Sequence, residues 1–159
     1  EFRCDAALYQ DWGGHLARQG LAPGAIVIET TEAVLLDEAR QVVDRLRQFR
    51  AMGLALALDD FGSGQVSLAC IQKADIDFLK IDRSLVGELG RDGAGQGLCE
   101  AIIALAQRLG LKVVAEGVET ASQRDLLRAA GCDYAQGYFF SRAVPAGQMD
   151  RLLASQPAA

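Results

Sequence analysis

The sequence lacks the features that mark membrane proteins and nucleic-acid-binding proteins. Its 159 residues contain no apolar run as long as a membrane span, and they do not begin with the pattern of a signal peptide. Lysine and arginine do not cluster with aromatic residues, and the formal net charge is −5, which argues against a polynucleotide partner. We therefore expect a cytoplasmic domain, whose parent protein could still be membrane-anchored. The first residue is Glu1 and not Met, as expected for a fragment or a processed chain.

Cysteine and histidine are also scarce. The four cysteines are Cys4, Cys70, Cys99 and Cys132, and no two of them form the C-x-x-C pair of a zinc site. We expect them to be small buried residues in a reducing compartment. The only histidine, His15, is expected on the surface of a helix, so a catalytic triad that depends on histidine is not expected.

Half of the residues are hydrophobic, which is enough for the core of one domain. Short apolar runs predict five strands, at residues 25–29, 54–59, 78–82, 112–116 and 134–138. A shorter helix is predicted near the start, at residues 9–20, and amphipathic stretches between the strands predict helices at residues 37–53, 98–110 and 120–131. The last three helices end at Gly53, Gly110 and Gly131, and the last one begins with a capping box of Thr120 and Gln123.

Alternating strands and helices predict an α/β fold with a parallel sheet. The strand ends follow one another every 20 to 34 residues, whereas a complete (β/α)₈ barrel needs roughly 250 residues. The chain therefore has room for about five units. It is either a five-stranded open sheet or the later part of a barrel whose beginning is absent. Residues 155–159 are expected to form a frayed tail.

Every predicted strand ends in a polar side chain. These residues are Glu29, Asp59 with Asp60, Lys80 with Asp82, Glu116 and Gln136. In parallel α/β folds the carboxyl ends of the strands face the binding site, so these side chains are expected to meet. Adjacent aspartates on one strand would point in opposite directions. They can share a site only if the chain turns after the first of them, and "FGSG" supplies such a turn.

Several carboxylates at one place repel one another unless a counter-charge lies between them. Divalent cations with oxygen ligands are the natural counter-charge, and one carboxylate can bridge two ions. We interpret Asp59 and Asp60 as metal ligands on this basis. Simpler interpretations exist for single residues: an acid at a strand end is often a helix N-cap, Glu32 and Glu119 could be capping or surface residues, and Lys80 could pair with Asp82.

Five segments in order over residues 26–145 resemble the motifs of the EAL-domain phosphodiesterases. They are "IETTE", "DDFGSGQVSL", "LKIDRSLV", "VVAEGVET" and "QGYFFSRAVP". The resemblance implies a TIM-type (β/α)₈ barrel, of which this chain holds about the last five βα units. The family's Glu-x-Leu signature and an early asparagine ligand are absent from residues 1–159, so the whole chain resembles a partial EAL domain.

The resemblance also implies a function and roles for single residues. The family hydrolyses the bacterial second messenger cyclic di-GMP to linear pGpG with two metal ions. Metal ligands would be Glu29, Asp59, Asp60, Glu116 and Asp82, with Asp59 shared between the ions and Asp82 in a supporting role. Lys80 and Glu116 would position the attacking water, and Gln136 would support the site by hydrogen bonding. Glu32 would hold the loop of Gly62, Ser63 and Gly64, and Glu119 would lie near the substrate.

By the same resemblance, Mg²⁺ or Mn²⁺ would be the cofactor and Ca²⁺ would inhibit. Cyclic di-GMP would be the ligand, a second copy of the chain the partner in a homodimer, and sensory or GGDEF-type domains the neighbours in the parent protein. The loop departs from the family at Gln65 and Val66, where tyrosine and serine are usual. Two alternatives remain: a cyclic di-GMP receptor or protein-interaction module without catalysis, and an α/β domain without an active site.

Overall fold

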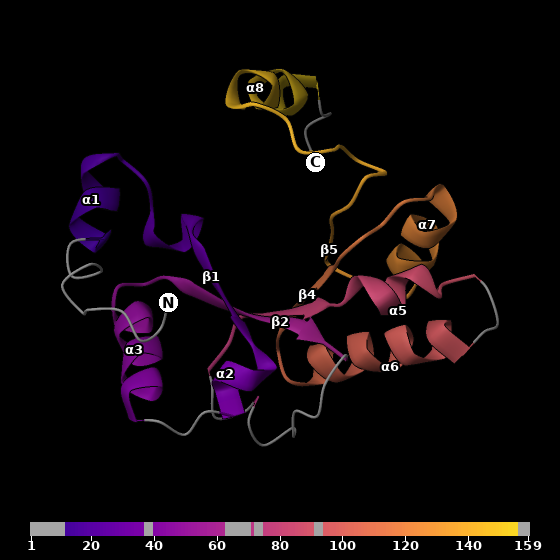
Figure 1. Cartoon of the computed structure of the whole chain (residues 1–159), viewed down its shortest axis with the longest axis horizontal. Helices are drawn as coiled ribbons and strands as arrows, with labels where there is room; N and C mark the ends of the chain where they lie inside the picture. The colour runs from indigo at the N-terminus through magenta and orange to yellow at the C-terminus, as the bar shows by residue number, and fades with distance from the viewer. Residues whose placement is uncertain (1–11, 37–39, 63–70, 72–74, 91–93, 156–159) are drawn as a thin grey trace.

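The protein contains one parallel β-sheet whose five strands follow one another in sequence order. The computed structural model describes residues 12–36, 40–62, 71, 75–90 and 94–155 (Figure 1). The strands are β1 (Val27–Thr31), β2 (Ala55–Phe61), β3 (Phe78–Ile81), β4 (Lys112–Ala115) and β5 (Tyr134–Ala135). Each is parallel to its neighbour, so the α/β fold predicted from the alternating pattern is confirmed.

Helices connect the strands and cover mainly one face of the sheet. They are α1 (Trp12–Arg18), the 3₁₀ helix η2 (Pro23–Ala25), α2 (Glu32–Leu36), α3 (Arg40–Ala51), α5 (Arg83–Gly87), α6 (Ala94–Arg108), α7 (Ala121–Ala129) and α8 (Ala146–Ser155). In Figure 1, α2, α3 and α6 lie along one side of the strands, while α8 stands apart at the end of an extended segment. Helices α2, α5 and α8 were not predicted from the sequence.

Alternate residues of each strand face opposite sides of the sheet. Leu56 and Leu58 of β2 pack in one apolar cluster with Phe49 of α3. Leu79 and Ile81 of β3 pack in a second cluster with residues of α6 and α7. The residues between these leucines and isoleucines therefore point to the other side, which we call the helix-free face, and the polar strand ends lie on it.

Local signals placed the helix ends correctly. Gly53, Gly110 and Gly131 have φ of 77°, 74° and 85°, the left-handed conformation that glycine adopts without strain. The capping box of α7 forms as predicted: the Thr120 side chain accepts from the Gln123 backbone N–H, and the Gln123 side chain accepts from the Thr120 N–H.

The predicted apolar face of α6 was partly wrong. Leu98, Ile102, Leu105 and Leu109 follow one another at helical spacing in the sequence and predict one apolar face, but Leu98 is 46% exposed. The buried face is a neighbouring stripe with helical spacing, formed by Cys99, Ile102, Ile103 and Ala106. Its small members, Cys99 and Ala106, let the helix lie close to the sheet.

Cysteine and histidine lie where the sequence placed them, as far as the structure describes them. Cys99 is buried, Cys132 is half-buried, and both are free thiols, whereas Cys4 and Cys70 lie outside the described residues. Burial raises the pKa of the Cys99 thiol to about 11, so this thiol stays protonated and unreactive at neutral pH. His15 is exposed on α1, as predicted.

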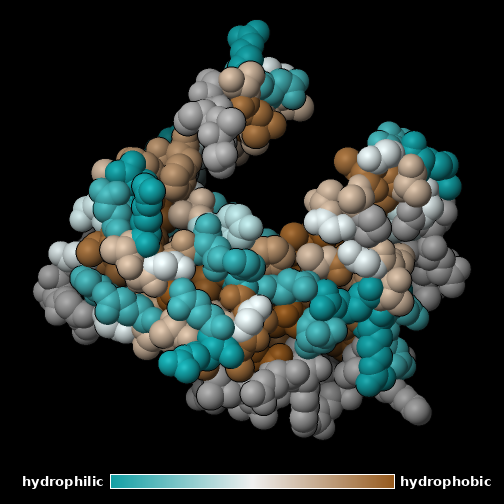
Figure 2. Space-filling model, turned by 180° about the vertical axis from the view of Figure 1, so that it is seen from behind, coloured by the Kyte–Doolittle hydropathy of each residue, from teal (hydrophilic) through white to brown (hydrophobic). Residues whose placement is uncertain are grey.

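The sheet has two open edges. Among the described strands, β1 pairs only with β2 and β5 only with β4. Val27 at one edge is 40% exposed and Tyr134 at the other is 54% exposed. Figure 2 shows a hollow in the surface below the arm that carries α8. These features are consistent with part of a barrel, the second of the two folds considered above.

No helix among the described residues is both long enough and apolar enough to cross a membrane. The predicted tail falls partly on α8, which continues to Ser155, and residues 156–159 lie outside the described part of the chain.

Candidate metal centre

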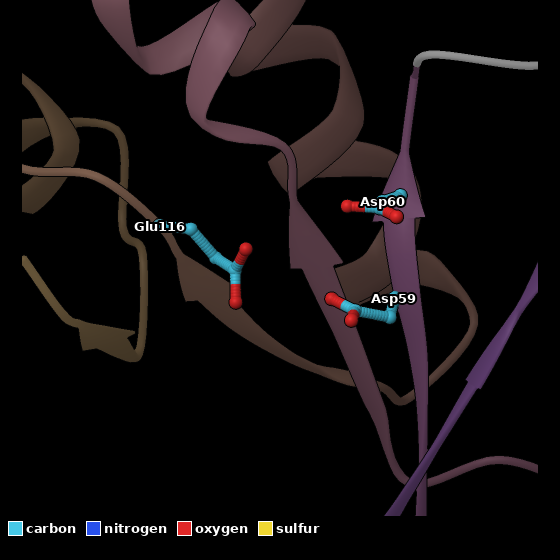
Figure 3. A group of neighbouring side chains, drawn as sticks. All are labelled: Asp59, Asp60 and Glu116. Carbon is cyan, nitrogen blue, oxygen red and sulfur yellow. The ribbon is translucent and has the colours of Figure 1, made fainter.

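Three carboxylates meet at the carboxyl ends of the strands. Asp59 and Asp60 come from the end of β2, and Glu116 directly follows β4. One oxygen from each lies within 4.8 Å of the others (Figure 3). This separation allows the three groups to bind the same ion, or two ions that share a carboxylate.

A β-bulge brings the two adjacent aspartates to one site. The pairing of β2 with β3 runs from Leu58 opposite Leu79 to Phe61 opposite Ile81, so β2 contains one extra residue. Asp60 takes up that residue with a φ of 57°, a left-handed conformation that aspartate tolerates better than most residues. The chain was expected to turn after Asp59, at "FGSG". Instead the strand continues to Phe61 and the change of direction occurs at Asp60 itself.

Lys80 of β3 lies among the carboxylates. Its ammonium Nζ is 2.7 Å from Glu29 Oε1, 2.9 Å from Asp59 Oδ1 and 2.6 Å from Glu116 Oε1, and its side chain is only 6% exposed. Burial lowers the pKa of Lys80, but hydrogen bonds to Glu116, Glu29 and Asp59 outweigh this effect and raise it above its ordinary value. The alternative pairing of Lys80 with Asp82 is therefore not what the structure shows.

Gln136, which directly follows β5, contacts the same group of side chains. Its Nε2 donates a hydrogen bond of 2.7 Å to Glu116 Oε1, the same oxygen that Lys80 approaches. Two donors on one oxygen fix the carboxylate plane of Glu116. The second oxygen of Glu116 is then held in a defined direction.

Asp82 lies outside the group of three carboxylates. It is the N-cap of α5, and its Oδ1 accepts hydrogen bonds from the backbone N–H and the hydroxyl of Ser84. These bonds, first the one from the hydroxyl, lower the pKa of Asp82 below its ordinary value. The simpler interpretation of an acid at a strand end, a helix N-cap, therefore holds for Asp82.

The remaining predicted residues lie around the group. Glu32 is buried at the start of α2, and Glu119 is exposed, with its backbone N–H bonded to Gln123 Oε1. Gly62 has a φ of 99°, which favours glycine, and Ser63 and Gly64 lie outside the described residues, as do Gln65 and Val66. The predicted contact between Glu32 and this loop therefore stays a prediction.

The residues of the group fit a divalent cation. The buried Oδ1 of Asp59 is paired with the Lys80 ammonium at 2.9 Å, and Glu29 and Glu116 share the same ammonium. One positive charge does not neutralise this group together with Asp60, so a further cation would relieve the repulsion that remains between the carboxylates. All donors are carboxylate oxygens, the ligands that Mg²⁺ and Mn²⁺ prefer.

Comparisons with known proteins show the family of the chain. The sequence pattern of the EAL domain matches residues 5–143. The cyclic di-GMP phosphodiesterase NbdA of Pseudomonas aeruginosa is 39% identical over 148 residues, which cover 93% of this chain and 19% of NbdA.

Solved structures are similar as well. The phosphodiesterase of MucR, solved as a complex with cyclic di-GMP, superimposes with a TM-score of 0.82 at 37% identity, covering 93% of this chain and 60% of that one. The Klebsiella pneumoniae protein BlrP1, solved with manganese and cyclic di-GMP, has a TM-score of 0.79 at 31% identity, covering 89% of this chain and 36% of that one. A further BlrP1 complex contains calcium and cyclic di-GMP.

The chain spans about a fifth of the length of the curated relatives that it matches, 19% of NbdA and 20% of MucR from Pseudomonas aeruginosa. The match nevertheless covers most of the chain itself and includes the carboxylates and Lys80 described above. The chain belongs to the EAL domain family.

Proposed function

We propose that this chain is the later part of an EAL domain that hydrolyses cyclic di-GMP to linear pGpG. The observation that carries the proposal is the group of Asp59, Asp60 and Glu116 around a nearly buried Lys80. A protein that only binds the nucleotide does not need three carboxylates within reach of one ion. The relatives named as cyclic di-GMP phosphodiesterases support the same substrate.

The proposed ligands are Asp59, Asp60, Glu29 and Glu116, with Asp59 between two ions. Bound ions would supply an activated water and stabilise charge on the attacking and leaving oxygens. Gln136 and Lys80 hold the carboxylate of Glu116 in place. Lys80 also presents a cation on the helix-free face, where it can hold a phosphate oxygen of the substrate or the attacking water.

Asp82, Glu32 and Glu119 have supporting roles in the proposal. Asp82 acts through the cap of α5 and not as a direct ligand, because it lies outside the group of carboxylates that can reach one ion. Glu32 would hold the loop that begins at Gly62. Glu119, whose side chain is exposed, would contact a base of the substrate.

Mg²⁺ or Mn²⁺ is the proposed cofactor, with two ions per site. BlrP1, a member of the same family, was solved with manganese and with calcium, each together with cyclic di-GMP. Calcium accepts a larger and looser set of ligands, so we expect it to bind and to inhibit.

The proposal extends to the surroundings of the domain. We propose that it is cytoplasmic and forms a homodimer, and that the parent protein carries sensory or GGDEF-type domains. MucR, a relative of this chain, is a bifunctional diguanylate cyclase and cyclic di-GMP phosphodiesterase. No polynucleotide partner is proposed.

The test is a reaction of the complete protein that contains this chain, loaded with Mn²⁺ or Mg²⁺ and supplied with cyclic di-GMP. Chromatography should show conversion to pGpG that stops when a chelator is added. Tight nucleotide binding without pGpG would instead favour a receptor.

A further inference from the structure

The buried side-chain amide of Gln123, on helix α7, makes one hydrogen bond that capping of the helix does not require. Gln123 is 9% exposed, and its Oε1 accepts from the backbone N–H groups of Glu119 (2.8 Å) and Thr120 (3.0 Å). These bonds belong to the cap of α7. Its Nε2 donates at 3.2 Å to the carbonyl of Val86, a residue of α5 that is 37 positions away in the sequence. The amide therefore ties the segment after Glu116 to a different helix.

Helix α5 contacts both segments that carry the carboxylates. Gly117, which follows Glu116, lies so close to α5 that a Cβ on it would be 2.6 Å from the Cβ of Arg83. Gly62, two residues after Asp60, lies close to Leu85 of the same helix, where a Cβ would be 2.5 Å from Cδ1. A displacement of α5 would therefore be transmitted to both sides of the carboxylate group.

Besides its contacts with Gly117 and Gly62, helix α5 is connected to the strand that carries Lys80. Helix α5 starts at Arg83, only three residues after Lys80, and Asp82 between them caps the helix. The position of α5 is thus coupled to the lysine as well as to the carboxylates. Metal affinity depends on ligand positions at the scale of half an ångström, so a small shift of α5 matters.

We propose that Gln123 is a positioning residue for the metal centre. Its amide holds α5 against the segment from Glu116 to Thr120 and thereby sets the separation of Glu116 from Asp59 and Asp60. Gln123 itself does not reach the carboxylates. This inference rests on the proposed function, because it assumes that the three carboxylates bind a cation.

The variant Gln123→Glu separates the two halves of the amide. A carboxylate still accepts from Glu119 and Thr120, but it cannot donate to the Val86 carbonyl, which it repels. The added negative charge by itself would strengthen cation binding, so a weaker affinity reports altered geometry. In the complete protein, calorimetric titration should show Mn²⁺ binding weakened roughly ten-fold or more. The melting temperature should fall, because a buried carboxylate facing a carbonyl is unfavourable, but the variant should be folded at the temperature of the titration, and kcat should fall more than KM changes.

Gln107→Glu is the matched control. Gln107 of α6 also donates through Nε2 to a backbone carbonyl, that of Gly131 at 3.2 Å, but at the opposite end of α7. Its substitution should leave Mn²⁺ affinity unchanged. Gln123→Met, which keeps the size of the side chain and removes both halves of the amide, should weaken Mn²⁺ binding equally and also lower the melting temperature.

Two results would overturn the inference in different ways. If either folded Gln123 variant bound Mn²⁺ with unchanged affinity, Gln123 would act only as a helix cap and would not position the metal centre. Absence of Mn²⁺ binding by the unaltered protein would overturn the proposed function, and the positioning role with it.

Discussion

At the scale of single residues, Asp60 has an unfavourable backbone conformation that a regular β-strand does not require. A left-handed conformation is unfavourable for residues other than glycine by about 1–2 kcal/mol. Asp60 adopts it inside a strand, with a φ of 57°, and so presents its carboxylate beside that of Asp59. Strain of this kind persists where a side chain is needed for binding or catalysis.

Asp59 lies at the centre of this group, and its replacement is the first prediction. Asp59→Asn should abolish most Mn²⁺ binding and lower turnover by roughly a hundred-fold or more, because the ion loses its shared ligand. The melting temperature of the metal-free protein should change little, because the substitution removes the ion pair with Lys80 but also relieves the repulsion between the carboxylates. Calorimetric titration and thermal melting measure the two effects.

Asp44→Asn is a suitable control for that substitution. Asp44 lies on α3 and its carboxylate pairs with Arg47 at 3.4 Å, on an exposed surface. It should change neither Mn²⁺ affinity nor turnover. Equal Mn²⁺ affinity for Asp59→Asn and the unaltered protein would mean that the aspartate pair is structural.

Lys80 supplies the counter-charge of the site when no metal is bound. Its pKa is raised above the ordinary 10.5, so the ion pairs contribute fully below pH 10.5 and are lost only as the pH rises through the higher folded value. At neutral pH the ammonium is therefore always present among Glu29, Asp59 and Glu116. A bound cation and Lys80 then share the same carboxylates.

The second prediction follows for Lys80→Met. Without the ammonium, the metal-free protein should lose about 2 kcal/mol of stability, less than for a fully buried pair because Glu29 is 51% exposed. Added Mn²⁺ should restore the melting temperature and raise it by more than in the unaltered protein, since the ion replaces the missing charge. Turnover should still be lost.

Lys112→Met is the control for the lysine. Lys112 lies at the start of β4 and pairs with Asp133 at 2.6 Å, away from the site. The increase in melting temperature caused by Mn²⁺ should be the same as in the unaltered protein. If Mn²⁺ stabilised Lys80→Met no more than this control, Lys80 would not compensate the carboxylates.

At the scale of elements, helix α5 depends on its cap. It has only five residues and no apolar pattern that would predict it, and Asp82 satisfies the N–H of Ser84 at its start. The pKa of Asp82 is lowered from 3.8, so this stabilisation is present above about pH 4 and is lost as the pH falls through the lower folded value.

The third prediction compares two substitutions of Asp82. Asp82→Ala removes the cap and should cost about 1 kcal/mol, measured by denaturant unfolding. Asp82→Asn keeps the cap without the charge, because asparagine is also a good N-cap, and should retain both stability and Mn²⁺ affinity. If Asp82→Asn kept the stability of the protein but bound Mn²⁺ more weakly, Asp82 would be a metal ligand, as the sequence predicted.

Strands β3 and β5 are each preceded by an aspartate that bonds to the backbone of the neighbouring strand. The apolar patterns of the sequence did not reveal these bonds. Asp77 directly before β3 accepts from the N–H of Leu56 in β2 at 2.8 Å, and Asp133 directly before β5 accepts from the N–H of Val113 in β4 at 3.0 Å. Each aspartate thus satisfies a backbone donor near the start of the preceding strand. The same arrangement therefore occurs before β3 and before β5, at the end of the sheet opposite to the site.

At the scale of the whole molecule, the two open edges of the sheet decide how the isolated chain should behave. A barrel protects its strands because each is paired on both sides, whereas β1 and β5 here each have one free side among the described residues. Large apolar side chains are exposed near these edges and on α8: Val27, Tyr134, Tyr138, Phe140, Met149 and Leu153. Such surfaces associate with other chains.

The fourth prediction is that residues 1–159, expressed alone, form aggregates or exchanged oligomers and do not hydrolyse cyclic di-GMP. Size-exclusion chromatography with light scattering measures the state. Val27→Lys, which places a charge on the β1 edge outside the carboxylate group, should reduce the association. A monomer that melts cooperatively would contradict the partial barrel and favour a self-sufficient open sheet.

The sequence by itself determined the features that depend on neighbouring residues. Apolar periods of two and of three to four residues located the five strands and the main helices, and Gly53, Gly110 and Gly131 marked helix ends. The polar residues that end the strands also identified the candidate site, because parallel strands necessarily bring their carboxyl ends together. These signals act within a few positions of the chain, so they can be read without a fold.

Only the tertiary structure decided which side chains meet. The bulge at Asp60, the three partners of Lys80 and the exposure of Leu98 each depend on register and on helix rotation. So does the bond from Gln123 to Val86, which joins residues far apart in the sequence. Residue spacing constrains these features weakly, because a shift of one residue in a strand or a rotation of a helix changes every contact while leaving the local pattern intact.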